Sequence, residues 1–321
     1  MCAQTKNMKA KNKVLTSMLF GLAAGLLLAA VPARALTPVT ACGQLLDVPG
    51  RAYILAADLD CSGTLTNGVN ITASNVVFHL AGHSISSTDC DATKGIQGIF
   101  VSLAISGVRI DGGTVRGFND GIGLNSSNSR VSAMTVTNAC FFGIALQSQN
   151  NQVDTSVVTL SGLDGIALQV ATGTVITAND ISRNLRLGVD ISNNSNNNFV
   201  TSNIINGNGT SGEQGGVGIF FGTNNVVANN ALDNNFNGIE IESPGNFVLT
   251  NQVNGSSSTG IFITTLGTPS TVKQNTVLGS VITDLNDNNA NCDTDIWRKN
   301  TFQTDLVAGA SDGGPGTGCI R

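Results

Sequence analysis

The chain has 321 residues, including 38 glycines, and only 12% of its residues are charged, with a formal net charge of −5. An acidic chain disfavours nucleic acids and membrane surfaces as partners. Low charge and many turn-forming residues could indicate disorder, but the regular placement of Val, Ile and Leu predicts a packed core.

The first 35 residues predict an export signal. Four lysines lie between residues 6 and 13, residues 14–31 are mostly apolar, and Ala33-Arg34-Ala35 forms a small-x-small cleavage site. We expect a secreted or periplasmic protein that is cleaved near Ala35 and carries no membrane anchor; an uncleaved anchor is the alternative. Loss of the leader brings the formal charge to −10. That charge disfavours polyanionic sugars unless a basic patch or a bound cation reverses its sign.

Six of the seven cysteines follow the leader, and an even number in an exported protein predicts disulfide bonds. Two pairs each flank a compact segment, so we expect Cys42 to pair with Cys61 and Cys292 with Cys319. Cys90 with Cys140 is the pairing that remains, and the sequence leaves it open. None of these thiols lies in a Cys-x-x-Cys motif, so we expect no metal site from them.

The first segments of the mature chain contain recognisable sequence motifs. After the stretch bounded by Cys42 and Cys61 come Leu80-Ala81-Gly82-His83-Ser84-Ile85 and the run Asp-Gly-Gly-Thr-Val-Arg-Gly-Phe at 111–118. They resemble the opening coils of secreted proteins of the pectin-lyase-like superfamily, which are right-handed parallel β-helices. The resemblance implies that residues 36–70 form an N-terminal cap over the first coil. His83 is either a catalytic base or a corner residue, and we favour the corner because no acid lies beside it in the sequence.

From residue 119 onward one short phrase repeats: a glycine, a branched aliphatic residue, any residue and another apolar residue. We identify its copies at Gly121, Gly143, Gly165, Gly188, Gly218, Gly238 and Gly260. The glycines are 22, 22, 23, 30, 20 and 22 residues apart, and the long step holds an insertion at 206–216. Apolar residues that alternate within a repeat of this length predict a β-solenoid.

A second column supports the same repeat. A polar residue follows an aliphatic residue by three positions in each coil, at Ser156, Asn179, Asn203, Asn230, Asn251 and Asn275. Stacked coils would place these side chains above one another, about 4.8 Å apart, where amides can hydrogen-bond along the stack. We therefore interpret them as a structural ladder.

Residues 289–321 break the repeat and contain Trp297, the only tryptophan. We expect Trp297 to cover the last coil; a sugar-stacking platform is the alternative. The predicted fold is all-β, a single-stranded right-handed parallel β-helix with disulfide-bonded caps. Its expected parts are a signal peptide at 1–35, an N-terminal cap at 36–70, coils at 71–285 and a C-terminal cap at 286–321.

Alternation places two side chains per repeat on the outer face of the glycine-containing strands. One outward column holds Asp190, Phe220, Glu240 and Phe262, and the other holds Glu242. Amides, acids and aromatic rings together suit a carbohydrate. Asp190 and Glu240 would lie two coils apart, roughly 10 Å, which is near the upper end of the range for inverting glycosidases.

We thus select Asp190, Glu240 and Arg186 as catalytic candidates. The substrate-binding candidates are Asp164, Phe220, Glu242 and Phe262. The expected partner is a polysaccharide or cell-surface glycan, bound by a monomer that needs no cofactor, although calcium stays open. A solvated face with local ion pairs is the simpler reading of these residues.

The motifs that mark known enzymes of this superfamily are missing. The chain lacks the Asn-Thr-Asp, Asp-Asp and Gly-His-Gly motifs of polygalacturonases and the Asp-Pro-His-Glu motif of alginate epimerases. The arginine and calcium motifs of pectate lyases are also not recognisable. Catalysis therefore stays open: the protein is a polysaccharide lyase or glycoside hydrolase, or else a non-catalytic extracellular scaffold or adhesion module.

Overall fold

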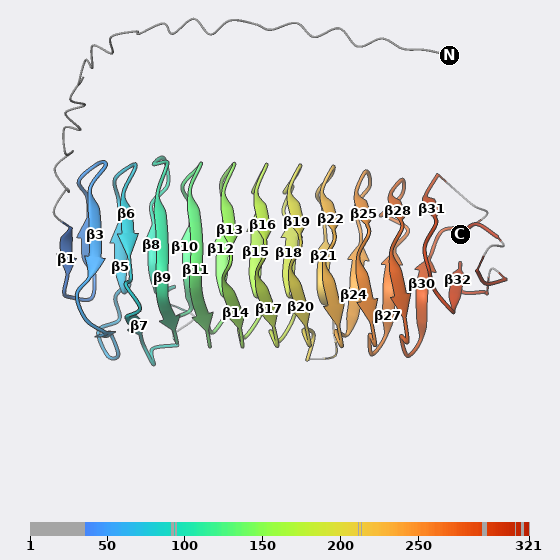
Figure 1. Cartoon of the computed structure of the whole chain (residues 1–321), viewed down its shortest axis with the longest axis horizontal. Coiled ribbons are helices and arrows are strands. Elements are labelled where there is room, and N and C mark those ends of the chain that lie inside the picture. Colours follow the sequence, from blue (N-terminus) through green and yellow to red (C-terminus); the bar gives the residue numbers. More distant parts are fainter. Residues whose placement is uncertain are drawn as a thin grey trace, which may run out of the picture. The chain divides into compact units, whose positions relative to one another are not determined.

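The computed structural model describes residues 36–90, 93, 95–210, 212, 214–290, 294–311, 313–315 and 318–320. These residues form stacked coils of strands and turns without a helix (Figure 1). Within this part of the chain no helix is long and apolar enough to cross a membrane. The predicted all-β parallel β-helix is confirmed. The predicted signal segment and Cys292 lie outside the described residues.

Each complete coil gives one strand to a smaller sheet and two short strands to a larger sheet. Among the described residues the smaller sheet has 12 strands. They are β2 (Gln44–Leu46), β5 (Val69–Ile71), β8 (Gln97–Val101), β10 (Asp120–Leu124), β12 (Ile144–Leu146), β15 (Ile166–Gln169), β18 (Val189–Ser192), β21 (Gly215–Ile219), β24 (Asn237–Ile241), β27 (Thr259–Ile263), β30 (Thr283–Asp287) and β32 (Asp305–Val307).

The larger sheet has 20 strands over the same described residues. They are β1 (Thr37–Val39), β3 (Ala52–Leu55), β4 (Leu59–Asp60), β6 (Val77–His79), β7 (Ser84–Ser86), β9 (Arg109–Arg116), β11 (Arg130–Thr137), β13 (Gln152–Asp154), β14 (Val157–Thr159), β16 (Val175–Thr177), β17 (Asp180–Ser182), β19 (Phe199–Thr201), β20 (Ile204–Asn206), β22 (Val226–Ala228), β23 (Ala231–Asp233), β25 (Phe247–Leu249), β26 (Gln252–Asn254), β28 (Thr271–Lys273), β29 (Thr276–Leu278) and β31 (Ile296–Arg298).

The repeated aliphatic residues fill the space between the two sheets. Each lies directly above its counterpart in the preceding coil, as Ile144, Ile166 and Val189 do across β12, β15 and β18. Ile166, Ile239 and Ile261 are completely buried. Burying an aliphatic side chain of this size stabilises the fold by about 2 kcal/mol, so the interior of the stack supplies the main driving force.

The repeat after the insertion differs from the expected alignment. Val217 pairs with Val189, Gly218 with Asp190, and Ile219 with Ile191. The repeat in this coil is therefore Gly216-Val217-Gly218-Ile219, and the alignment that began at Gly218 is wrong by two residues. The glycine steps become 28 and 22 where 30 and 20 were assigned.

The predicted asparagine ladder is present in the bend between the two larger-sheet strands of each coil. The backbone N–H and the side-chain Nδ2 of Asn179 both donate to Oδ1 of Asn203, each at 3.0 Å. The same pattern continues through Asn230, Asn251 and Asn275 and ends on Asn300. At the other end the backbone N–H of Ser156 donates to Asn179.

Two further ladders flank the first, and the sequence analysis missed both. One links Asn184, Asn208 and Asn235, and the other links Asn198, Asn225 and Asn246. Their members lie five residues after or before members of the first ladder, so the same spacing was available as a signal. In all three rows the asparagines give buried amide groups of the neighbouring coils a hydrogen-bond partner.

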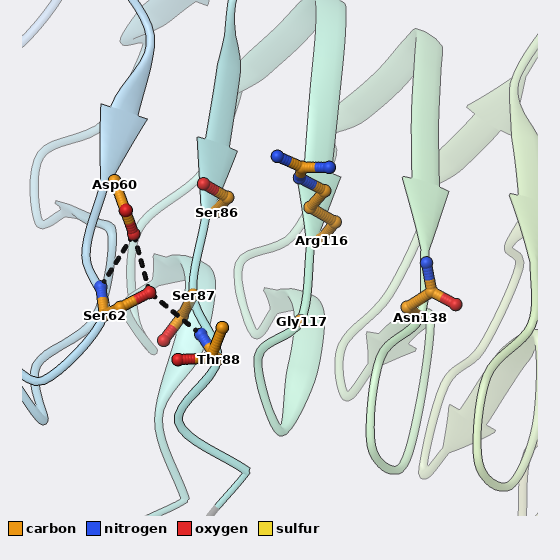
Figure 2. A pocket seen from close by; sticks show the side chains of 8 residues that line it. All are labelled: Asp60, Ser62, Ser86, Ser87, Thr88, Arg116, Gly117 and Asn138. Atoms are coloured by element: carbon orange, nitrogen blue, oxygen red, sulfur yellow. Dashed lines mark hydrogen bonds between the residues drawn. The ribbon is translucent and has the colours of Figure 1, made fainter.

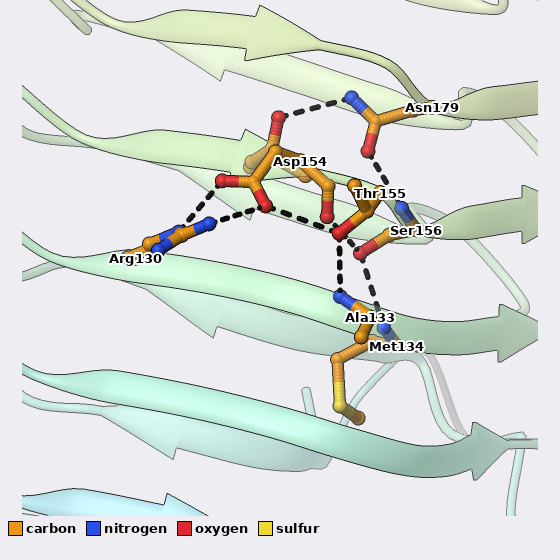
Figure 3. A network of polar contacts seen from close by, with 8 residues as sticks. Arg130, Ala133, Met134, Asp154, Thr155, Ser156 and Asn179 are labelled. Carbon is orange, nitrogen blue, oxygen red and sulfur yellow. Dashed lines mark hydrogen bonds and ion pairs between the residues drawn. The ribbon is translucent and has the colours of Figure 1, made fainter.

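Figure 3 shows the first ladder where it begins on β11 and β13. Ser156 accepts a hydrogen bond from the backbone N–H of Met134 and donates its own N–H to Asn179. On the outer side, Arg130 makes two hydrogen bonds to Asp154, at 2.7 and 2.8 Å. The corner is thus held from the core side by the ladder and from the outside by an ion pair.

Disulfide bonds connect Cys42 with Cys61 and Cys90 with Cys140. The first pair was predicted, and the second supplies the partners that the sequence left open. The proposed Cys292–Cys319 pair stays a prediction because Cys292 lies outside the described residues. Trp297 is buried in β31 beside Val272 and donates to Asp287 at 2.8 Å, so it covers the last coil and offers no exposed platform.

Asn203→Ala should destabilise the full chain by about 3 kcal/mol, because it removes hydrogen bonds to three buried partner groups, each worth roughly 1 kcal/mol or more. These partners are the backbone N–H and Nδ2 of Asn179 and the carbonyl of Ile176. Urea unfolding followed by circular dichroism measures the effect. The control Asn254→Ala removes one exposed bond to Asp233 and should change stability by less than about 0.5 kcal/mol. Equal effects of the two variants would contradict a structural ladder.

Candidate functional site

The candidate site lies on the outer face of the smaller sheet. Strand pairing places one outward residue from each coil in a single column, which runs Phe100, Gly123, Ala145, Ala167, Asp190, Gly218, Glu240, Phe262 and Asn286. Asp190, Glu240 and Phe262 thus share a column as expected. Asp190 and Glu240 are separated by one coil, which puts their α-carbons about 10 Å apart.

Phe220 does not occupy the column position assigned to it from the sequence. That position belongs to Gly218, and Phe220 lies two residues further along the chain, beside Ser192 and Glu242 in the next column. Its ring nevertheless covers Gly218, since a side chain built at Gly218 would collide with the ring atoms. The ring therefore fills the gap between Asp190 and Glu240.

Asp164, Arg186 and Asp190 form a connected group beside the middle of this column. The Arg186 guanidinium makes two hydrogen bonds to Asp164, one of them from Nε to Oδ1 at 2.7 Å, and donates to Oδ2 of Asp190 at 3.3 Å. The backbone N–H of Leu187 adds a further bond to Asp164. Asp164 is completely buried. Asp164 therefore lies beneath the surface and holds Arg186 in place. The sequence had suggested that Asp164 contacts the substrate.

Asp190 is the strongest candidate for acid–base chemistry. Its residue is only 4% exposed, and burial, followed by the nearby charge of Asp164, raises the pKa of Asp190 from 3.8 to about 7. Oδ2 accepts hydrogen bonds from Arg186 and Ser192. Oδ1 is buried without a partner, which is an expensive arrangement for a carboxyl oxygen and points to a ligand or water contact.

Glu240 is the second carboxyl group in this column with a raised pKa. Partial burial, followed by the charge of Glu242 two residues along the same face, raises the pKa of Glu240 from 4.5 to about 7. Nδ2 of Asn237 donates to Glu240 at 3.4 Å. Two carboxyl groups that change protonation near neutral pH therefore lie on one face, with an aromatic ring between them. Clusters of this kind occur most often at catalytic sites.

A polar hollow elsewhere on the described residues lacks this combination. A hollow of about 310 Å³ on the larger sheet is lined by Asp60, Ser86 and Arg116, among others (Figure 2). The side chain and backbone of Ser62 hydrogen-bond Asp60 and lower the pKa of that carboxyl, so it stays ionised and cannot donate a proton at neutral pH.

Both histidines have an acidic neighbour in space. Nδ1 of His79 lies 2.8 Å from Asp111, and Nδ1 of His83 lies 3.3 Å from Asp58. Asp58 precedes His83 by 25 residues, and so the sequence did not place an acid beside it. Among the described residues, no group of three or more His, Cys, Asp or Glu side chains could hold a metal ion.

Comparison with known proteins identifies the architecture. The family model for the right-handed β-helix region matches residues 97–243 and 159–296. No curated protein sequence matches the chain.

Solved structures resemble the chain at low sequence identity. Tailspike protein 2 from Escherichia coli O157:H7 bacteriophage CAB120 has a TM-score of 0.59 and 14% identity, with 78% of this chain and 39% of the tailspike chain covered. The Agl-KA catalytic domain has a TM-score of 0.53 and 12% identity, with 72% and 52% covered. DFA-IIIase from Arthrobacter chlorophenolicus A6 in complex with GF2 has a TM-score of 0.51 and 13% identity, with 80% of each chain covered.

These likenesses show the fold. This chain spans about two fifths of the tailspike and about half of the Agl-KA domain. Their activities therefore do not transfer to it through the fold.

Asp164→Asn should lower the pKa of Asp190 from about 7, because it removes a like charge and leaves Arg186 free to pair with Asp190. Carbon NMR titration of labelled aspartate carboxyls measures the shift. The matched control is Asp154→Asn, which weakens the same kind of arginine pair on the larger sheet and should leave Asp190 unchanged. An unaltered Asp190 pKa in the Asp164 variant would show that the two carboxyls are not coupled.

Proposed function

The chain belongs to the right-handed β-helix family, and from that premise we propose that it binds a polysaccharide on the outer face of its smaller sheet and hydrolyses glycosidic bonds there. The observation that carries the proposal is the pair of carboxyl groups with raised pKa values, Asp190 and Glu240, in one outward column. The resemblance of the opening coils to the pectin-lyase-like superfamily supports a carbohydrate as the partner.

Glu240 is the proposed general acid. Its pKa of about 7 keeps a proton on the carboxyl at neutral pH, as protonation of the leaving glycosidic oxygen requires. It is only half-buried, so a bound sugar can reach it. The neighbouring carboxylate of Glu242 favours retention of this proton, because two adjacent negative charges repel each other.

Asp190 is the proposed general base. The unpartnered Oδ1 is buried in this structure and would hold the attacking water once sugar binding moves the ring of Phe220 aside, while Arg186 and Ser192 fix Oδ2. In the reaction this water forms a bond to the anomeric carbon as the bond to the glycosidic oxygen breaks. Asp190 takes the proton from the water and Glu240 gives its proton to the leaving oxygen, so charge and atoms balance.

We expect inversion at the anomeric carbon, because the α-carbons of the two groups lie about 10 Å apart, which leaves room for a water. Inverting enzymes keep their carboxyl groups about 6.5–9.5 Å apart to admit a water, whereas retaining enzymes need about 5–5.5 Å. One intervening coil separates Asp190 from Glu240. The ring of Phe220 over Gly218 offers an apolar support for the sugar between them.

Glu240→Gln should lower kcat for a polysaccharide substrate by about 100-fold or more, since it removes the general acid, while binding changes little. A panel of neutral and acidic polysaccharides, assayed for new reducing ends with and without calcium, identifies the substrate and gives the rates. The control Asp233→Asn alters a carboxylate of the larger sheet and should leave the rate unchanged.

The pH profile tests the same assignment. Glu240 acts while protonated and Asp190 while ionised, and both pKa values are about 7, so kcat/KM should follow a narrow bell centred near neutral pH. Proton NMR of the first product should show the inverted anomer. Retention of configuration, or full activity of Glu240→Gln, would refute this mechanism. Glycan binding without turnover would instead indicate a non-catalytic scaffold.

We also propose that the protein is exported and cleaved near Ala35. The support is the pattern of the first 35 residues together with two disulfide bonds in the described chain. N-terminal sequencing of the full-length gene product from a bacterial host should give Leu36 as the first residue in the periplasm or medium. An intact N-terminus in the cytoplasmic fraction would contradict export.

A further inference from the structure

A hollow of about 330 Å³ adjoins the proposed site at the ends of the smaller-sheet strands. Its lining includes Asn194, Phe221, Thr223, Glu242, Pro244 and Leu266. Glu242 belongs to both regions, because it lies two residues beyond Glu240 on the same outward face. Alternate residues of a strand are about 7 Å apart, so a ligand over Glu240 lies next to this hollow.

The floor of the hollow is apolar and open to water. Phe221 is 64% exposed and Leu266 is 62% exposed, and Pro244 between them is also exposed. They come from three successive coils. Exposed apolar side chains that cluster in a concave surface usually mark a binding site.

Phe221 has a backbone conformation that aromatic residues rarely adopt. Its backbone has φ of 57°, a left-handed conformation that is unfavourable for an aromatic residue. The same corner of the preceding coil carries Asn193 at φ of 53°, and asparagine adopts this conformation readily. The turn therefore does not require phenylalanine at this position.

The rim of the hollow determines which ligand it suits. Asn194 and Thr223 offer hydrogen bonds, and Glu242 is the one charged residue in the lining. A negative charge repels uronates and sulfated sugars. An apolar floor with polar groups at its edge matches the C–H face and the hydroxyl groups of an uncharged pyranose ring.

We infer that this hollow is a subsite for an uncharged sugar residue, which stacks on Phe221 and lies next to the residue held over Glu240. The inference rests on the proposed function and specifies its substrate class as a neutral polysaccharide. Phe221 acts in binding and takes no part in the chemical step.

Phe221→Ala should weaken binding of neutral oligosaccharides, because stacking on an aromatic ring is worth about 1 kcal/mol, which corresponds to about a fivefold rise in Kd. Isothermal titration with short and long β-linked gluco-, xylo-, manno- and chito-oligosaccharides, and with oligogalacturonate as the acidic probe, measures the change. Phe221→Trp should restore affinity. The matched control is Val170→Ala, which truncates a 65% exposed residue that is also left-handed, with φ of 62°, and lies outside the hollow.

The outcomes separate this subsite from the proposed hydrolysis. If Glu240→Gln abolishes turnover while Phe221→Ala leaves Kd and KM for every neutral probe unchanged, the subsite is wrong and the hydrolase stands. If Phe221→Ala weakens binding of neutral probes and no variant affects turnover, the subsite stands without the enzyme. Tighter binding of oligogalacturonate than of all neutral probes overturns the substrate class.

Discussion

The corner between the two strands of the larger sheet is the constraint on which the rest of the molecule depends. In each coil the residue before the ladder asparagine is left-handed, as at Ala178, Ser202 and Thr250, with φ of 56°, 58° and 55°. For a residue other than glycine this conformation is unfavourable by about 1–2 kcal/mol. The amide of the next residue offsets that strain by bonding to the coils on both sides. Because the corners are regular, the aliphatic residues of successive coils lie directly above one another. The outward-facing side chains are aligned in columns for the same reason.

The periodicity of the chain was sufficient to predict the coils, the first ladder and the buried aliphatic residues, because each depends on spacing along the sequence. The position of Phe220 could not be predicted in this way. Gly216-Val217-Gly218-Ile219 and Gly218-Ile219-Phe220-Phe221 both satisfy the repeated phrase, and a shift of two residues preserves the alternation of inward and outward side chains. Only the pairing of Gly218 with Asp190 decides between them. A regular spacing between repeats would have distinguished the two alignments, but the insertion at 206–216 makes the spacing irregular here.

The role of Asp164 was hidden for a different reason. Alternation along a strand tells which way a side chain points, but an outward side chain can still be covered by its neighbours. Arg186 extends over Asp164 and ties it to Asp190, so one carboxylate supports the guanidinium while the other receives a single bond from it. The two aspartates therefore differ in how they contact Arg186: Asp164 accepts two hydrogen bonds from it and Asp190 accepts one. The sequence identified Asp164, Arg186 and Asp190 as candidates, but only the structure shows which of them contact one another.

The three asparagine rows have a consequence for the molecule as a whole. Within each row, Nδ2 of one asparagine donates to Oδ1 of the asparagine in the next coil toward the C-terminus, and it also donates to a backbone carbonyl on the N-terminal side. Amide dipoles aligned head to tail reinforce one another, so the stack carries an electrical polarity like that of a helix, with its positive pole at the last coils. One row passes from Asn246 through Ser270 to the carboxylate of Asp295. The carboxylate of Asp295 thus lies at the positive end of this row, where a negative charge is favourable.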